Sequence, residues 1–189
     1  MANNCYNSAS IEGSKQMLDK FEKALNKAKK EDRALFNATF YKVLGQQPIE
    51  DDVYNNFGSR WFEATWERQS PTTGVLSGDS AWSPVSEFFL QLSSVYSLTI
   101  ASTYEETGED FGGWYYCQNG IVLRDETTSY YAFRYMDDRE HTLQSMIEDA
   151  SEGYWESADE LCPELLEIMR SKDKAELIEA VEQSILDRA

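Results

Sequence analysis

Small or apolar side chains alternate with polar ones at the start of the chain, between residues 4 and 11. The first set is Cys5, Asn7, Ala9 and Ile11, and the second is Tyr6, Ser8 and Ser10. A period of two is typical of a β-strand with one buried face. The pattern therefore predicts a strand here, which Gly13 and Ser14 end.

The period becomes helical after Ser14. The apolar stripe consists of Met17, Leu18, Phe21, Ala24, Leu25 and Ala28. Six lysines lie mostly on the other side: Lys15, Lys20, Lys23, Lys27, Lys29 and Lys30. This spacing predicts an amphipathic helix with a basic face, which is either a binding surface or, more commonly, a solvated helix face.

The middle of the chain predicts a mixture of elements. Residues 34–44 form an apolar, aromatic run that fits either element type, and residues 46–56, with Pro48, indicate a surface loop or short helix. Residues 61–67 and 74–81 predict two aromatic strands. Ser83 followed by proline indicates a helix start.

The helix expected after Ser83 has a clear apolar stripe. Its members are Val85, Phe88, Phe89, Leu92, Val95 and Tyr96. Residues 98–104 then predict a strand, and residues 105–113 an acidic loop containing glycines. Strands are expected at 114–117, 121–124 and 130–136, the first two joined by an Asn119-Gly120 hairpin turn that accepts positive φ.

Beyond Asp137 the pattern is helical only. Three apolar stripes follow, and Asp173 with Glu176 resembles a capping box at the last of them. The order strand, helix, strands, helix, strands predicts an α+β fold of the ferredoxin-like split βαβ type, an antiparallel sheet with helices on one face. We therefore expect a domain over residues 1–136 and an acidic helical extension over residues 137–189.

The distribution of charge limits the classes of partner. Net charge is −17, and residues 137–189 alone carry 5 basic and 16 acidic side chains. Residues 1–45, by contrast, carry 8 basic and 5 acidic ones. Such a field repels phosphates and attracts basic surfaces, which disfavours direct nucleic-acid binding unless the first helix provides it locally.

Composition also predicts the compartment and the state of the cysteines. No apolar run approaches the roughly 20 residues of a membrane span. The first residues lack the basic and apolar regions of a secretory signal, so we expect a cytoplasmic location. The wide spacing of Cys5, Cys117 and Cys162 predicts free buried thiols rather than disulfides or a zinc site.

No residue pattern predicts catalysis or a cofactor. His141 is the sole histidine and lies in a polar helix start, where a solvated role is expected. Asp110-Phe111-Gly112 matches a kinase triplet without the other kinase motifs. An acidic cluster could hold Ca²⁺ or Mg²⁺, although its spacing is not that of an EF-hand and a solvated loop is the favoured interpretation. Its members are Glu105, Glu106, Glu109 and Asp110.

Tryptophans and tyrosines are frequent in the predicted sheet. The tryptophans are Trp61, Trp66, Trp82 and Trp114. Most should belong to the core. If several face outward, they form a binding platform that stacks bases or anchors a protein, and the acidic surroundings favour a protein.

Four separated segments resemble one known family. They are Met1-Ala2-Asn3-Asn4-Cys5-Tyr6-Asn7, Trp61-Phe62-Glu63-Ala64-Thr65-Trp66, Gly78-Asp79-Ser80-Ala81-Trp82-Ser83-Pro84 and Asp110-Phe111-Gly112-Gly113. Together they resemble the YubB-type ferredoxin-like domain family of plasmid and bacteriophage proteins, over residues 1–136. The resemblance implies a ferredoxin-like fold and a mobile-element origin in a bacterial host, and it assigns no functional residue.

Three functional hypotheses follow. The preferred one is a non-enzymatic acidic protein that binds a host or mobile-element protein with a basic surface, by presenting carboxylates as a DNA mimic does. The second is a nucleic-acid-binding module that uses the aromatic sheet and the lysines of the first helix. The third is a metal-dependent hydrolase built on the 105–110 loop.

Overall fold

The computed structural model describes residues 3–30, 34–47, 56–155, 157, 160–161 and 163–188. The chain divides into two compact units. The first, called the sheet unit here, comprises residues 1–109 and 113–126; the second, the helical unit, comprises residues 110–112 and 127–189. The predictions for Pro48 and for Cys162 lie outside the described residues. No helix in the described part of the chain is long and apolar enough to span a bilayer.

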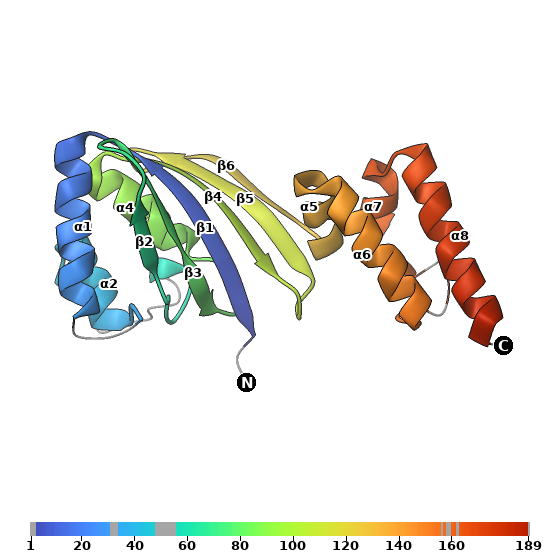
Figure 1. The fold of residues 1–189 in the computed structure, drawn as a ribbon. Helices are drawn as coiled ribbons and strands as arrows, with labels where there is room; N and C mark the ends of the chain where they lie inside the picture. Colours follow the sequence, from blue (N-terminus) through green and yellow to red (C-terminus); the bar gives the residue numbers. More distant parts are fainter. Residues whose placement is uncertain are drawn as a thin grey trace. The chain divides into compact units, whose positions relative to one another are not determined.

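The sheet has six strands in the order β2-β3-β1-β4-β5-β6 (Figure 1). The strands are β1 (Asn4–Glu12), β2 (Thr65–Arg68), β3 (Thr73–Ala81), β4 (Thr99–Glu106), β5 (Phe111–Gln118) and β6 (Ile121–Thr128). The pairs β1–β3, β1–β4 and β2–β3 are antiparallel. The order β2-β3-β1-β4 arises from two interleaved βαβ units, because each crossover helix leaves room for one strand between the two it joins. The predicted α+β class is confirmed.

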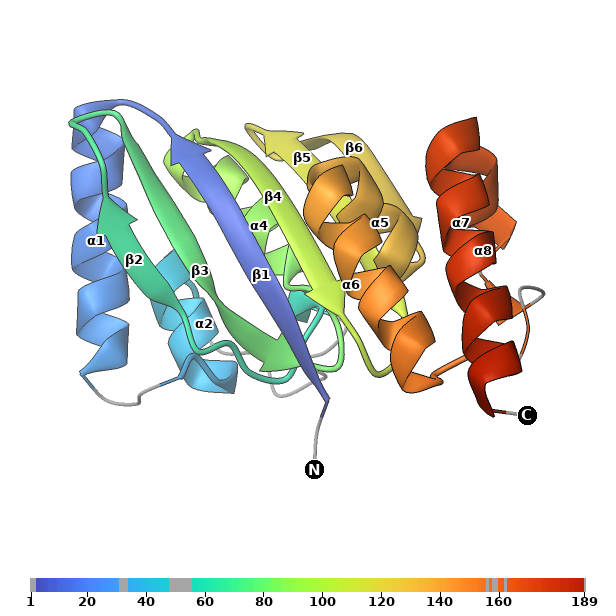
Figure 2. The same cartoon turned by 45° about the vertical axis from the view of Figure 1, so that its right-hand side comes forward.

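Within the sheet unit, three helices pack on one face of the sheet (Figure 2). They are α1 (Lys15–Lys29), α2 (Asn37–Leu44) and α4 (Ser86–Tyr96). No described helix of that unit lies on the other face, which we call the open face. The predicted alternation in β1 is confirmed, since Cys5, Asn7, Ala9 and Ile11 are all fully buried. Buried side chains of α1 and α4, including Phe21 and Phe89, complete the core on that side.

Burial also determines the chemistry of two cysteines. Cys5 and Cys117 are free, buried thiols, as predicted. Burial raises the pKa of the Cys5 thiol to about 12, because a desolvated thiolate is disfavoured. The Cys117 thiol donates to the carbonyl of Phe89 at 3.6 Å, and burial raises its pKa as well.

One buried amide joins β1 to β3 and to the start of α4. Asn7 is 0% exposed. Its Nδ2 donates to the Cys5 carbonyl at 2.9 Å and to Ser80 Oγ at 2.8 Å. Its Oδ1 accepts from the backbone N–H of Val85 at 3.1 Å. Both amide hydrogens and the amide oxygen are therefore satisfied in the core, as buried polar groups require.

The β5–β6 hairpin turns as predicted, and it ends the sheet with an exposed strand. Asn119 and Gly120 have φ of 51° and 79°, the left-handed values of a tight hairpin turn. β6 is the edge strand, with Ile121, Val122 and Leu123 exposed by 62%, 43% and 53%.

Several predicted element boundaries are wrong. The acidic loop at 105–113 is only a four-residue turn, because β4 extends to Glu106 and β5 begins at Phe111. The helix expected after Ser83 begins at Ser86 with Val85 as its N-cap. Ser83 Oγ donates to the carbonyl of Gly58, and Ser83 lies two residues before the N-cap position, so it does not cap this helix.

The strand predicted at 130–136 is wrong as well. These residues form helix α5 (Tyr130–Asp137), with Ser129 as its N-cap. Aromatic residues favour strands intrinsically, but tertiary packing overrides that preference here. Ala132 and Tyr135, one helical turn apart, belong to the core of the helical unit.

The helical unit packs α5 with three further helices. They are α6 (Arg139–Glu152), α7 (Pro163–Ile168) and α8 (Ser171–Arg188). Its core includes Met146, Leu165 and Leu177. The predicted capping role of Asp173 is wrong, because Asp173 is the third residue of α8 and its carboxylate accepts from Tyr135 Oη at 2.7 Å.

The Asn7 amide generates a stability prediction. We expect Asn7→Ala to lower the free energy of unfolding by about 2–4 kcal/mol, because it leaves a cavity and a buried N–H of Val85 without its acceptor. The matched control is Ser8→Ala, the next residue on the opposite face, with an expected change within about 0.5 kcal/mol. Urea unfolding followed by tryptophan fluorescence measures both, and equal losses would contradict the role assigned to Asn7.

Candidate functional site

The open face of the sheet consists of rows of side chains that cross neighbouring strands. Ser10 of β1 lies between Val75 of β3 and Ala101 of β4, and Ser8 lies between Ser77 and Thr103. Directly paired residues of antiparallel strands project from the same face. The centre of this face therefore carries small side chains, mostly serine and alanine.

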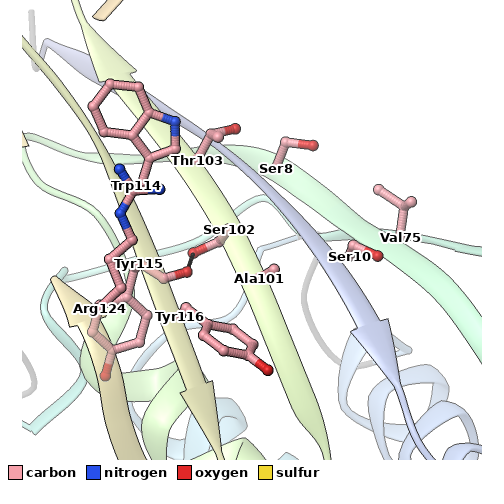
Figure 3. A pocket seen from close by; sticks show the side chains of 10 residues that line it. All are labelled: Ser8, Ser10, Val75, Ala101, Ser102, Thr103, Trp114, Tyr115, Tyr116 and Arg124. Carbon is pink, nitrogen blue, oxygen red and sulfur yellow. Dashed lines mark hydrogen bonds between the residues drawn. The ribbon is translucent and has the colours of Figure 1, made fainter. Parts of the chain in front are cut away.

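Larger side chains border this centre and form a trough with a volume of about 500 Å³ (Figure 3). Trp114 and Tyr116 of β5 stand along one side, and Val75 stands on the other. Ser8, Ser10, Ala101 and Thr103 form the floor. We call this feature the sheet trough. Its size and its mixture of aromatic and hydroxyl side chains are typical of a binding site.

Trp114 is held in place by Arg124 of β6. The Arg124 guanidinium lies 4.8 Å from the centre of the indole ring, within cation–π range. The same guanidinium donates to Glu126 Oε2 at 2.5 Å, and this hydrogen bond lowers the pKa of the Glu126 carboxyl. Arg124 therefore packs on the aromatic wall, with a carboxylate beside its charge at the surface.

The sheet trough leads along β1 to a third row that carries charge. Tyr6 is 45% exposed and is paired with Asp79 of β3 on one side and with Glu105 of β4 on the other. An exposed aromatic ring thus lies between two carboxylates at this end of the open face.

The predicted tryptophans are not brought together into one platform. Trp114 borders the sheet trough, whereas Trp66 packs edge-on against Phe21 of α1, with ring centres 5.0 Å apart. Trp82 is 47% exposed, just past the end of β3. Trp61 is half-buried in the segment that precedes β2. The aromatic contribution to the open face comes mainly from β5.

The predicted acidic cluster is not brought together either. Glu106 is only 3% exposed, and its carboxylate accepts the backbone N–H groups of Gly108 and Glu109. Asp110, with φ of 52°, accepts the N–H of Tyr130 at 3.2 Å. Glu105 belongs to the row beside Tyr6. Among the described residues, no group of three or more potential ligands is placed to hold a metal ion.

The lysines of α1 lie on the side of the sheet away from the trough. Phe21 and Leu25 of α1 pack against the helix-covered face. Lys15 pairs with Asp19 at 2.6 Å, and Lys29 donates to the carbonyl of Ala64. The basic helix and the aromatic trough therefore do not form one continuous surface within the sheet unit.

The helical unit presents carboxylates along two helices. On α8, Glu176, Glu179 and Glu182 are exposed, while Leu177 and Val181 are buried. In the described part of the chain these three glutamates form no ion pair. The acidic side chains are therefore directed to solvent by the same amphipathic pattern that buries the apolar ones.

Exposed glutamates also follow α6, where they are Glu140, Glu148 and Glu152. Glu148 accepts from Gln144 at 3.0 Å, and Glu140 lies 3.7 Å from Arg139. His141 is exposed in the first turn of this helix, as predicted for a solvated histidine.

A buried carboxylate of the helical unit is neutralised internally. Asp173 is 4% exposed and accepts from Tyr135 Oη at 2.7 Å and from Arg139 at 2.8 Å. The hydrogen bond from Tyr135 lowers the pKa of the Asp173 carboxyl below its ordinary value of 3.8, and Arg139 adds to this effect. Asp173 therefore belongs to the internal structure, unlike the exposed glutamates of α8.

Comparison with a family model supports the fold class. Residues 61–145 match a family model described as the ferredoxin-like domain in Api92-like protein. The chain is also similar to the crystal structure of a protein api92 from Yersinia pseudotuberculosis, at 9% identity and a TM-score of 0.43. That similarity covers 69% of this chain and 98% of the other. No curated protein matches the chain.

The environment of Asp173 generates a pH prediction. Because the folded-state pKa is lowered, its contribution to stability is present above pH of about 4 and is lost as pH falls toward the folded-state pKa. We expect Asp173→Asn to destabilise the protein at neutral pH and to flatten the fall in stability below about pH 4.

Thermal unfolding followed by helical circular dichroism over that pH range measures this effect. Asp187→Asn is the matched control, since Asp187 is exposed on the same helix and accepts from Gln183. If Asp173→Asn keeps the acid dependence of the unchanged protein, Asp173 is not the group responsible.

Proposed function

We propose that the protein acts without catalysis, by binding a protein partner whose basic surface contacts the exposed glutamates of α6 and α8. In this proposal it is a phage or mobile-element protein, as the YubB-type resemblance implies, and works in the cytoplasm of a bacterial host. The partner is a host or element protein that binds nucleic acid, and the carboxylates take the place of phosphates.

The observation that supports this proposal most is the row of carboxylates on α8. Glu176, Glu179 and Glu182 follow one another every three residues on the exposed surface. At a rise of 1.5 Å per residue this is one carboxylate per about 4.5 Å of helix axis, against one phosphate per about 3.4 Å in a DNA strand. The row thus approaches the linear charge density of one nucleic-acid strand.

The exposed glutamates are not needed to build the helical unit. The buried side of α8 is apolar at Leu177 and Val181, and its buried acid is the separate Asp173. Surface charge of one sign costs stability through self-repulsion and in return accelerates association with surfaces of opposite charge. Solubility is the simpler role of such charge, and that role predicts no salt-sensitive partner.

The two alternative functions have less support from the geometry. A nucleic-acid-binding sheet would combine the trough with the lysines of α1, but these lie on opposite faces of the sheet unit. Arg124, the basic residue beside the trough, is paired with Glu126. A metal-dependent hydrolase at residues 105–110 would need converging carboxylates, whereas Glu106 is occupied by the backbone of its own turn.

The α8 row generates a binding prediction. The protein is immobilised, bacterial lysate is applied at low salt, and the bound proteins are eluted at high salt and identified. We expect a basic partner that duplex DNA displaces. The triple variant Glu176→Gln, Glu179→Gln and Glu182→Gln neutralises the row. It should lower the affinity for the purified partner about tenfold at low salt and reduce the salt dependence of binding.

The matched control removes the same charge from the other unit. Glu63→Gln, Glu67→Gln and Glu109→Gln neutralise three exposed carboxylates of the sheet unit. Glutamine preserves both helix propensity and side-chain size. The proposal fails if no salt-sensitive partner is retained. It also fails if the control triple variant lowers the affinity for the partner as much as the α8 triple variant does.

A further inference from the structure

The sheet trough has the repeat of an extended peptide. Its two rows are centred on Ser10 and Ser8, and the next row beyond it is centred on Tyr6. These three are alternate residues of β1. Alternate residues of a strand are about 7 Å apart along its axis. An extended peptide lying along β1 has the same repeat, so that every second side chain would point into successive rows.

The first two rows can hold apolar side chains. Their floor is made of small residues, Ser8, Ser10 and Ala101, and Trp114 and Tyr116 rise beside them (Figure 3). A leucine-sized side chain placed there would contact aromatic faces without displacing the floor. The serine hydroxyls remain within the trough as possible partners for polar groups of the peptide.

The third row can hold a cation. Tyr6 presents an exposed ring between the carboxylates of Asp79 and Glu105. An ammonium or guanidinium group over such a ring gains a cation–π contact and two attractive charges. A phosphate at this end would meet both carboxylates, so the charge of this row disfavours a nucleic-acid strand.

We propose that the open face of the sheet unit binds an extended peptide segment of a partner protein, lying along β1. Two apolar side chains at alternate positions occupy the rows of Ser10 and Ser8, against Trp114 and Tyr116. A lysine or arginine two positions further along lies on Tyr6 between Asp79 and Glu105. This site is independent of the glutamates of the helical unit and stands whether or not those bind a partner.

The probe is a synthetic peptide with this spacing, Ac-Ser-Leu-Ser-Leu-Ser-Lys-Ser-NH2. A second probe carries norleucine in place of lysine and has the same length without the charge. Calorimetric titration of the full chain should show saturable binding of the lysine peptide with a dissociation constant below about 1 mM. The norleucine peptide should bind about tenfold more weakly.

Two sets of variants separate the cation row from the apolar rows. The double variant Asp79→Asn, Glu105→Gln should bind the lysine peptide about tenfold more weakly and bind the norleucine peptide as tightly as the unchanged protein does. Glu12→Gln is the matched control, because Glu12 is exposed on the same face of β1 at its other end. Ala101→Leu fills the trough from an exposed position and should abolish binding of both peptides.

Chemical shifts of backbone amides locate the bound peptide. Shifts in β1, β4 and β5 that disappear in Ala101→Leu support the proposal. It is overturned if the shifts concentrate in β6, which would indicate strand addition at the sheet edge. It is also overturned if Glu12→Gln lowers the affinity for the lysine peptide as much as the double variant does. A third contrary result would be single-stranded DNA or RNA binding the trough more tightly than the peptide.

Discussion

The sheet unit depends on the burial of one amide at the junction of three elements. Asn7 satisfies backbone groups of Cys5 and Val85 and a hydroxyl of Ser80, so the start of α4 is tied to β1 and β3. The Asn7 amide, together with buried Cys5, Ala9 and Ile11, fixes which side of β1 faces the helices. The alternate residues Tyr6, Ser8 and Ser10 consequently face the open side. A one-residue slip in register would turn these residues inward and the buried residues outward.

Much of the fold could be predicted from periodicity. The alternation in β1, the stripe of α1 and the Asn119-Gly120 turn all depend on local chemistry that the sequence displays directly. The failures have tertiary causes. Residues 130–136 have strand-like composition, but Tyr135 and Ala132 find their apolar partners only in α6, α7 and α8. Asp173 resembles a capping residue, but its partner is Tyr135, distant in sequence.

The candidate site was harder to predict, because its distinctive feature is an absence of large side chains. Ser8 and Ser10 read as ordinary polar residues of a strand, and only the register with Val75 and Ala101 shows that they form a floor. The conspicuous residues were less informative. Trp66 packs against Phe21 of α1 and Glu106 belongs to a turn. Of the four predicted tryptophans, Trp114 alone borders the sheet trough.

The negative charge of the chain also opposes self-association at the exposed edge of the sheet. Ile121, Val122 and Leu123 leave an apolar segment on β6 that another copy could pair with. The charged residues Arg124, Asp125 and Glu126 follow it at once and act as gatekeepers. Mutual repulsion between chains of net charge −17 adds a longer-range barrier, which dissolved salt weakens over a Debye length of about 8–10 Å at physiological ionic strength. The same acidity therefore keeps copies of the chain apart. At high ionic strength, where this repulsion is screened, β6 is the first surface at which copies would associate.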